Sequence, residues 1–95
     1  MKGYWISIYE KVAETEIQKK YAEKATIAIL KYSGKILVRG GKNISLEGSI
    51  SPRTVIAEFP SYENAVKCYN SNEYKEALSI LKGNAKRNLQ IVEGI

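Results

Sequence analysis

The order of strand-like and helix-like segments constrains this chain more than any other feature. Residues 4–9 alternate between two sets of side chains that are both largely apolar, which predicts a strand with no face suited to water. Apolar residues at three- and four-residue intervals then predict a helix that ends near Ser33. The later segments predict two strands, two consecutive helices and a last strand, at residues 35–39, 53–59, 62–69, 72–82 and 88–93. The predicted order is therefore β-α-β-β-α-β.

Local signals set the expected ends of the helices. Residues Thr15–Gln18, of sequence TEIQ, fit a capping box at the start of the first helix. Gly34 is expected to take the left-handed conformation that closes the same helix. Ser61 and Ser71 are expected to cap the next two helices, and Gly83 to end the second of them.

This order predicts an α+β fold with a single domain over residues 1–95. It is that of the ferredoxin-like unit, a four-stranded antiparallel sheet with its helices on one face. The other face then stays bare, although its strands offer apolar side chains to either side. A bare apolar sheet face marks an interface or a ligand groove, and we expect a homodimer in which two sheets meet about a twofold axis.

Composition removes several classes of site. The chain has no histidine, and all ten of its acidic residues are glutamates. Without histidine, neither Ser-His nor Cys-His catalysis nor a His-ligated zinc site can form, so we expect no metal and no cofactor. The single cysteine, Cys68, is expected to be a packed side chain rather than a nucleophile. No segment approaches the length of a membrane span and the first residues do not resemble a signal peptide, so a cytoplasmic location is expected.

Two arginines are the first candidates for a ligand site. Strands 35–39 and 53–59 are expected to be antiparallel neighbours, so Arg39 leaves the sheet at the end where Arg53 enters it. A pair of guanidinium groups beside Gly40 suits a small anionic molecule, because arginine binds carboxylates with two parallel hydrogen bonds. The alternative is structural: Glu47, Glu58 or backbone carbonyls could satisfy both arginines.

A second candidate cluster lies where the two consecutive helices meet. Tyr69, Ser71 and Tyr74 would bring phenol groups and free backbone donors to one place, and we expect them to border the same cleft as Arg39. Glu58 and Tyr74 are the candidate acid–base residues. The alternative is that Ser71 only caps its helix and both tyrosines pack.

Short motifs along the whole chain resemble those of the DUF1330 family. They are GYWI, LVRGG, LEG, PR, EFPS, YNS, EY and VEG, beginning at Gly3, Leu37, Leu46, Pro52, Glu58, Tyr69, Glu73 and Val92. The resemblance implies a dimeric α/β barrel, and the family has no established activity.

Three functions compete on this evidence. The first is a dimeric small-molecule-binding barrel, either a binding protein or a cofactor-free enzyme acting on a small carboxylated or aromatic metabolite. The second is a regulatory module without chemistry. The third, which we regard as the weakest, is an RNA-binding module, because the segment Lys2–Tyr9 partly matches the RNP1 pattern but occurs on the wrong strand. We expect neither a nucleic acid nor a membrane as partner.

Overall fold

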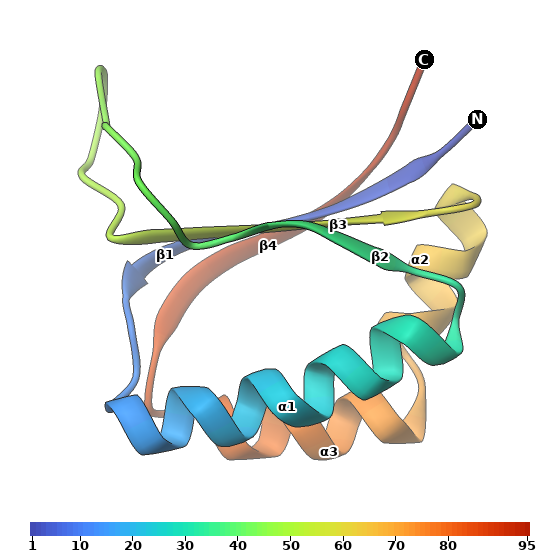
Figure 1. Cartoon of the computed structure of the whole chain (residues 1–95), viewed down its shortest axis with the longest axis horizontal. Coiled ribbons are helices and arrows are strands. Elements are labelled where there is room, and N and C mark those ends of the chain that lie inside the picture. The colour runs from blue at the N-terminus through green and yellow to red at the C-terminus, as the bar shows by residue number, and fades with distance from the viewer.

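The computed structural model describes all 95 residues and has two layers, a sheet and the helices beneath it (Figure 1). Its elements follow the predicted order, with the second helical part made of two helices. They are β1 (Gly3–Lys11), α1 (Thr15–Lys31), β2 (Lys35–Arg39), β3 (Arg53–Phe59), α2 (Tyr62–Tyr69), α3 (Asn72–Leu81) and β4 (Lys86–Glu93). No helix is long and apolar enough to cross a membrane.

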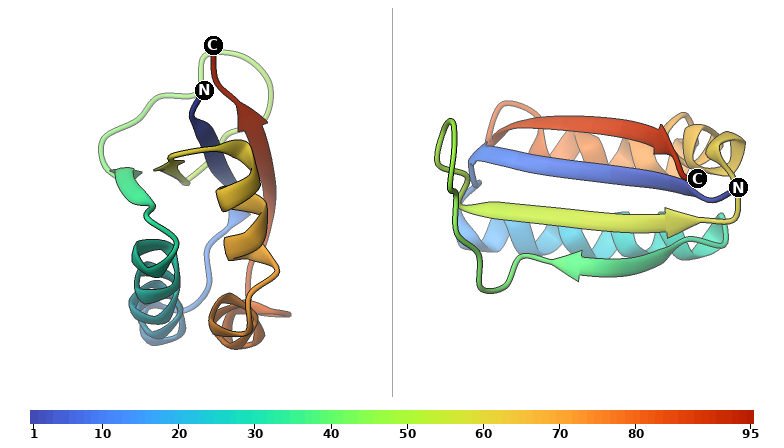
Figure 2. Two further views of the ribbon diagram at one scale, coloured as in Figure 1. Left: turned by 90° about the vertical axis from the view of Figure 1, so that its right-hand side faces the viewer. Right: turned by 90° about the horizontal axis from the view of Figure 1, so that it is seen from above.

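The four strands form one antiparallel sheet in the order β2-β3-β1-β4. β1 and β3 therefore occupy the centre, while β2 and β4 form opposite edges, as the view from above shows (Figure 2). Residues that pair across an antiparallel ladder project to the same face. The register thus fixes which side chains of all four strands meet on each face of the sheet.

The helix-covered face contains the core. Trp5 is only 2% exposed and packs against Phe59 and Tyr74, with ring centroids 5.8 Å and 4.7 Å away. Ser7 and Tyr9 follow Trp5 on the same face of β1 and are also buried. α1 and α3 lie side by side beneath the sheet (Figures 1 and 2), and they contribute mostly alanine, tyrosine and aliphatic side chains to the core.

Two predicted helix ends are wrong. Glu14, not Thr15, precedes the first turn of α1, and no side chain caps it. Gln18 instead accepts a hydrogen bond from the amide of Ala13, so the capping-box glutamine satisfies a backbone donor without the threonine. At the other end Ser33 takes the positive φ, 64°, because the closing hydrogen bonds run from Ser33 to Leu30 and from Gly34 to Ile29, which puts the turn at Ser33. Gly34 is needed for another reason, since a Cβ there would clash with Ile29 and Phe59. The predicted caps Ser61 and Ser71 are confirmed.

The opposite face of the sheet carries no helix (Figure 1). By register, Ile6 lies between Ile56 on β3 and Gln90 on β4, and Val38 continues the row onto β2. Ile8, on the same face, keeps 44% of its surface exposed. We call this the open face; its centre is apolar, as the alternation along β1 predicted.

The connection between β2 and β3 projects on the open side of the sheet, away from the helices (Figure 1). It has no regular secondary structure, and its backbone turns through Gly40 and Gly41 at positive φ. Three large apolar side chains of this loop, Ile44, Leu46 and Ile50, are each at least 78% exposed.

Candidate functional site

All three arginines of the chain line one cavity between α1 and the sheet. Its apolar wall includes Trp5 and Val55 from the sheet and Ile29 from α1, while hydroxyl groups and the arginines supply the polar part.

The sheet register explains how three distant arginines come together. Arg53 on β3 and Arg87 on β4 pair with the two sides of Tyr9, and Arg39 on β2 pairs with Val55. Arg53 and Arg87 therefore lie in one row across the sheet with Tyr9 between them, and Arg39 lies in the adjacent row, all three on the helix-covered face. Arg53 and Arg87 are two strands apart, so their backbones are separated by about 10 Å.

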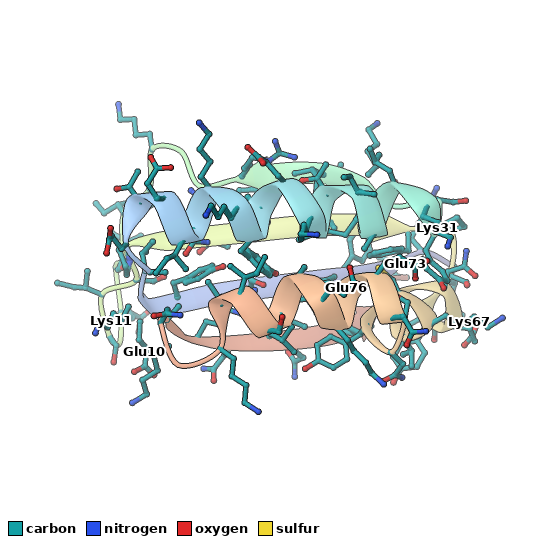
Figure 3. The ribbon with its side chains drawn as sticks, turned by 90° about the horizontal axis from the view of Figure 1, so that it is seen from below. Glu10, Lys11, Lys31, Lys67, Glu73 and Glu76 are labelled. Carbon is teal, nitrogen blue, oxygen red and sulfur yellow. The ribbon has the colours of Figure 1, made fainter.

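None of these arginines forms an ion pair, and no glutamate lines the cavity. Every ion pair in the molecule joins a lysine to a glutamate on the outer surface, such as Lys31–Glu73 and Lys24–Glu76 between α1 and α3 (Figure 3). Like charges close together in a partly buried site raise the free energy of the empty cavity. The site therefore concentrates positive charge that the protein itself does not neutralise.

Arg87 is held by hydroxyl oxygens. Its Nη1 donates to Ser7 Oγ at 3.1 Å, to Tyr21 Oη at 3.1 Å and, more weakly, to Tyr9 Oη at 3.4 Å. Its Nη2 donates to Tyr74 Oη at 2.7 Å. The guanidinium also lies over the rings of Tyr9 and Tyr21, at 5.5 Å and 5.1 Å from their centroids, a cation–π geometry. These contacts fix the position of Arg87 without cancelling its charge.

The hydroxyl groups around Arg87 have protons to spare. Each of the four oxygens accepts a hydrogen bond from Arg87, and each hydroxyl carries one proton of its own. One proton serves the 2.7 Å bond between Tyr21 and Tyr74. The other three find no acceptor in the protein, since Tyr9 only receives a second bond, from Gln18. This end of the cavity therefore offers donors and needs an acceptor.

Burial keeps the phenols protonated. Burial raises the pKa of Tyr74 and of Tyr21 above the ordinary value of a phenol. Burial alone would lower the pKa of Arg87, but the oxygens of Tyr21, Tyr74 and Tyr9 outweigh it and raise that pKa overall. Arg87 consequently keeps its full positive charge, and Tyr21 and Tyr74 stay neutral, across the physiological pH range.

The Nε–H group of Arg53 is a further hydrogen-bond donor without an acceptor. Its Nε is buried and has no hydrogen-bond partner, and such a donor typically costs about 1–3 kcal/mol. Gly40 makes this position possible: a Cβ there would lie 2.6 Å from Nη1 of Arg53. Gly40 and Arg53, both predicted to be ligand-binding residues, are therefore neighbours, and the missing side chain of Gly40 leaves room for the guanidinium group.

Arg39 lies at the mouth of the cavity. Its side chain is exposed, and its Nη2 donates a long 3.3 Å hydrogen bond across to Thr26 Oγ1 on α1. Two surface depressions adjoin the cavity: one shares Gln18, Ala22 and Arg53 with it, and the other shares Ala22, Thr26 and Arg39. The enclosed volume is about 30 Å³, which is room for about two water molecules. A larger molecule can enter only if the mouth widens.

The second predicted cluster does not border this cavity. Tyr69 lies beside β4, against Leu89 and Ile91, on the opposite edge of the sheet from Arg39. The prediction of one shared cleft is wrong because β3 and β1 separate the two edge strands. Ser71 is buried and caps α3, accepting from the amide of Tyr74 at 3.1 Å.

The two candidate acid–base residues lie on opposite faces of the sheet. Glu58 pairs with Tyr4 in the register and lies on the open face, where it accepts from Tyr4 Oη and pairs with Lys2. It cannot act in the arginine cavity, nor does it or Glu47 neutralise an arginine. Tyr74 does approach the cavity, but behind Arg87 and Tyr21 rather than on its wall.

Sequence reasoning missed Arg87 and the hydroxyls that hold it. The last strand was predicted from Asn88, two residues too late, although Arg87 alternates with Leu89 and Ile91. That alternation places Arg87 on the core side of the strand, and a core-side arginine without an adjacent acid is a signal of a site.

Residues 2–95 match the family model DUF1330, described as a domain of unknown function. No curated protein matches the chain. Among solved structures, the RPA0582 protein of unknown function from Rhodopseudomonas palustris has a TM-score of 0.79 at 17% identity, over 99% of this chain and 82% of that one.

Two other similar structures share the fold more loosely. A dimeric ferredoxin-like protein of unknown function from Thermobifida fusca has a TM-score of 0.55 at 13% identity, covering 99% of this chain and 92% of that chain. A Nitrosomonas europaea protein, provisionally named an antibiotic biosynthesis monooxygenase, has a TM-score of 0.56 at 13% identity, over 100% and 99% of the chains. At these identities the likeness shows the ferredoxin-like fold alone.

Proposed function

The chain belongs to the DUF1330 family, and we propose that it binds a small carboxylated molecule in the cavity between α1 and the sheet. One observation carries the proposal: all three arginines line this cavity, and no acidic side chain of the protein forms an ion pair with any of them. The orphan Nε of Arg53 and the spare hydroxyl protons around Arg87 add donors that a carboxylate can accept.

The cavity lining favours a binding protein over an acid–base enzyme. General-base catalysis needs a group that can take up a proton near neutral pH. The cavity is lined by arginines, phenols, a serine, a glutamine and apolar groups, and burial holds Tyr21 and Tyr74 in their protonated form. Each of the polar side chains in this lining can donate a hydrogen bond. The non-catalytic alternative is therefore the better supported one.

The same geometry weakens the RNA-binding alternative. An RNP1-type strand displays its aromatic rings on the open face of the sheet, where bases stack on them. Here Trp5 and Tyr9, at 2% and 1% exposure, point into the core instead. Of the aromatic residues in that segment, only Tyr4 lies on the open face.

We also propose that two copies pair through their open faces, as predicted from the apolar strands. Ile6, Ile8 and Ile56 supply an apolar centre, and the loop 40–52, which has three exposed large apolar side chains, lies on the same side of the sheet (Figure 1). Clustered exposed apolar surface of this kind is typical of an interface. The Thermobifida fusca neighbour is described as dimeric.

Thermal-shift screening of small carboxylates tests the proposed ligand class. The wild type should be stabilised by at least one carboxylate, and Arg39→Ala should weaken its binding by about 1.5 kcal/mol, the low end for a charge-assisted hydrogen bond because Arg39 is exposed. Lys35→Ala is the matched control, since Lys35 lies on the same strand but pairs with Glu58 on the open face. If no carboxylate stabilises the wild type, or if both variants weaken binding equally, the proposal fails.

A further inference from the structure

We infer that the preferred ligand is a short dicarboxylate that spans the cavity, with one carboxylate at Arg87 and the other between Arg53 and Arg39. This inference rests on the proposed function and specifies its ligand class. The cavity has two positively charged ends, because Tyr9 separates Arg87 on one side from Arg53 on the other. The backbones at the two ends are about 10 Å apart.

The two ends offer different sets of donors. At the inner end Arg87 is fixed by four hydroxyl oxygens, and the hydroxyls of Tyr9 and Ser7 have protons to donate. At the outer end Arg53 presents an Nε without a partner, and Arg39 is tethered only by its long bond to Thr26. Each end can therefore bind a carboxylate independently, the inner end rigidly and the outer end adaptably.

Tyr9 lies between the two ends, and the cavity beside it is mostly apolar. Trp5, Ala57 and Val55 line that part from the sheet, and Ala25 and Ile29 from α1. A chain of methylene groups fits such a wall, whereas a hydroxyl or amide in the middle of the ligand would lose its hydrogen bonds to water.

Charge balance also favours two anionic groups. Three guanidinium groups line the cavity without a protein carboxylate. A bound monoanion would leave two of the three positive charges without a counter-charge, whereas a dianion would leave only one. Because the enclosed volume is about 30 Å³, binding must displace Arg39 from Thr26 and widen the mouth. The exposed position of Arg39 allows this movement.

Isothermal titration calorimetry of the whole protein at pH 7 tests the inference. The probes are unbranched dicarboxylates of three to six carbons, each compared with the monocarboxylate of the same chain length. At one length or more, the dicarboxylate should bind about tenfold tighter or better, the value of one additional charge-assisted bond. Arg53→Met should abolish that advantage while leaving the weaker monocarboxylate binding at the Arg87 end.

Lys35→Met is the matched control. It removes the same charge from the face opposite the cavity, so the advantage of the dicarboxylate should persist if contact rather than overall charge produces it. Arg39→Met is a second outer-end variant, at an exposed position, and should reduce the advantage even if Arg53→Met does not fold.

The outcomes separate the two proposals. If monocarboxylates and dicarboxylates bind the wild type equally well, the two-ended site is wrong and the proposed carboxylate site stands. Equal loss of the advantage in Lys35→Met and Arg53→Met would also overturn the two-ended site. If neither class binds, both proposals fail.

Discussion

The two faces of one sheet differ in what they leave unsatisfied. Beneath the sheet, apolar groups are buried and packed, and the unsatisfied groups are hydrogen-bond donors and positive charges around Arg53 and Arg87. On the open face Glu58 is paired with Lys2, and the unsatisfied groups are apolar side chains such as Ile8.

The alternation of β1 produces this difference. Trp5, Ser7 and Tyr9 point to the helices, whereas Ile6 and Ile8 point away from them. Unpaired hydrogen-bond donors on the helix-covered face favour the binding of an anion. Exposed apolar side chains on the open face favour packing against another apolar surface. One strand thus serves a ligand with one set of side chains and a partner with the other.

Truncation of Trp5 should produce the largest effect and mark the helix-covered face as the core. Trp5→Ala removes a ring that packs against Phe59 and Tyr74, so the free energy of unfolding should fall by about 3–5 kcal/mol. That is a large share of the total stability of such a domain. Ile8→Ala, on the open face, should cost about 1 kcal/mol. Urea unfolding of both variants measures this, and equal losses would remove the distinction between the faces.

A charge on the open face should separate the two copies. Ile56→Glu places a carboxylate at the centre of the proposed interface, where burying it unpaired is unfavourable. Sedimentation equilibrium at micromolar concentration should show a dimer for the wild type and a monomer for this variant. Ile27→Glu, at a 65% exposed position on α1, is the control and should stay dimeric. A folded wild-type monomer at that concentration would refute the proposed interface.

Two neighbouring glycines distinguish backbone strain from an effect on the site. Gly40 and Gly41 have φ values of 66° and 89°, so alanine at either should cost about 1–2 kcal/mol of stability. Only the Cβ at position 40 would contact a neighbour, Nη1 of Arg53. Gly40→Ala should therefore weaken carboxylate binding several-fold more than Gly41→Ala, as measured by calorimetry. Equal affinities would show that the placement of Arg53 does not matter for the ligand.

The smallest effect on the site is expected at Cys68. The side chain is fully buried, and burial raises the pKa of its thiol to about 12. The thiol therefore ionises in the unfolded chain at lower pH than in the fold, so its contribution to stability is complete below about pH 9 and is lost as pH rises toward about 12.

Chemical labelling measures directly how well the fold protects the Cys68 thiol from reagents. A thiol reagent at pH 8 should react only after unfolding, and Cys68→Ala should leave carboxylate affinity unchanged. Rapid labelling of the native protein, together with loss of carboxylate binding, would show that Cys68 belongs to a site.

The sequence predicted the fold well because its signals are local and repeated. The alternation along β1 and the caps at Ser61 and Ser71 each involve a few adjacent residues, and all three predictions held. The closing residue of α1 was predicted wrongly because glycine at position 34 serves tertiary packing: it allows close contact with Phe59, while Ser33 has the positive φ.

The site was only half predictable, because strand order decides which residues meet. Arg39 and Arg53 are close through one connection, and their proximity follows from the sequence. Arg87 lies in the same cavity only because β1 lies between β3 and β4. No local sequence pattern predicts that strand order. The same strand order places Tyr69 at the far edge, away from Arg39.

The central claim is that the arginines beneath the sheet bind a carboxylate directly, and nuclear magnetic resonance of their side chains tests it. The chain has only three arginines, so three Nε–H signals can be assigned by single Arg→Lys variants. On titration with the carboxylate that gives the largest thermal shift, the signals of Arg53 and Arg87 should move together with one dissociation constant. That constant should stay the same between pH 6 and pH 8, because arginine keeps its charge throughout that range. Binding that leaves both signals in place, with shifts confined to open-face residues such as Ile6, would contradict the account.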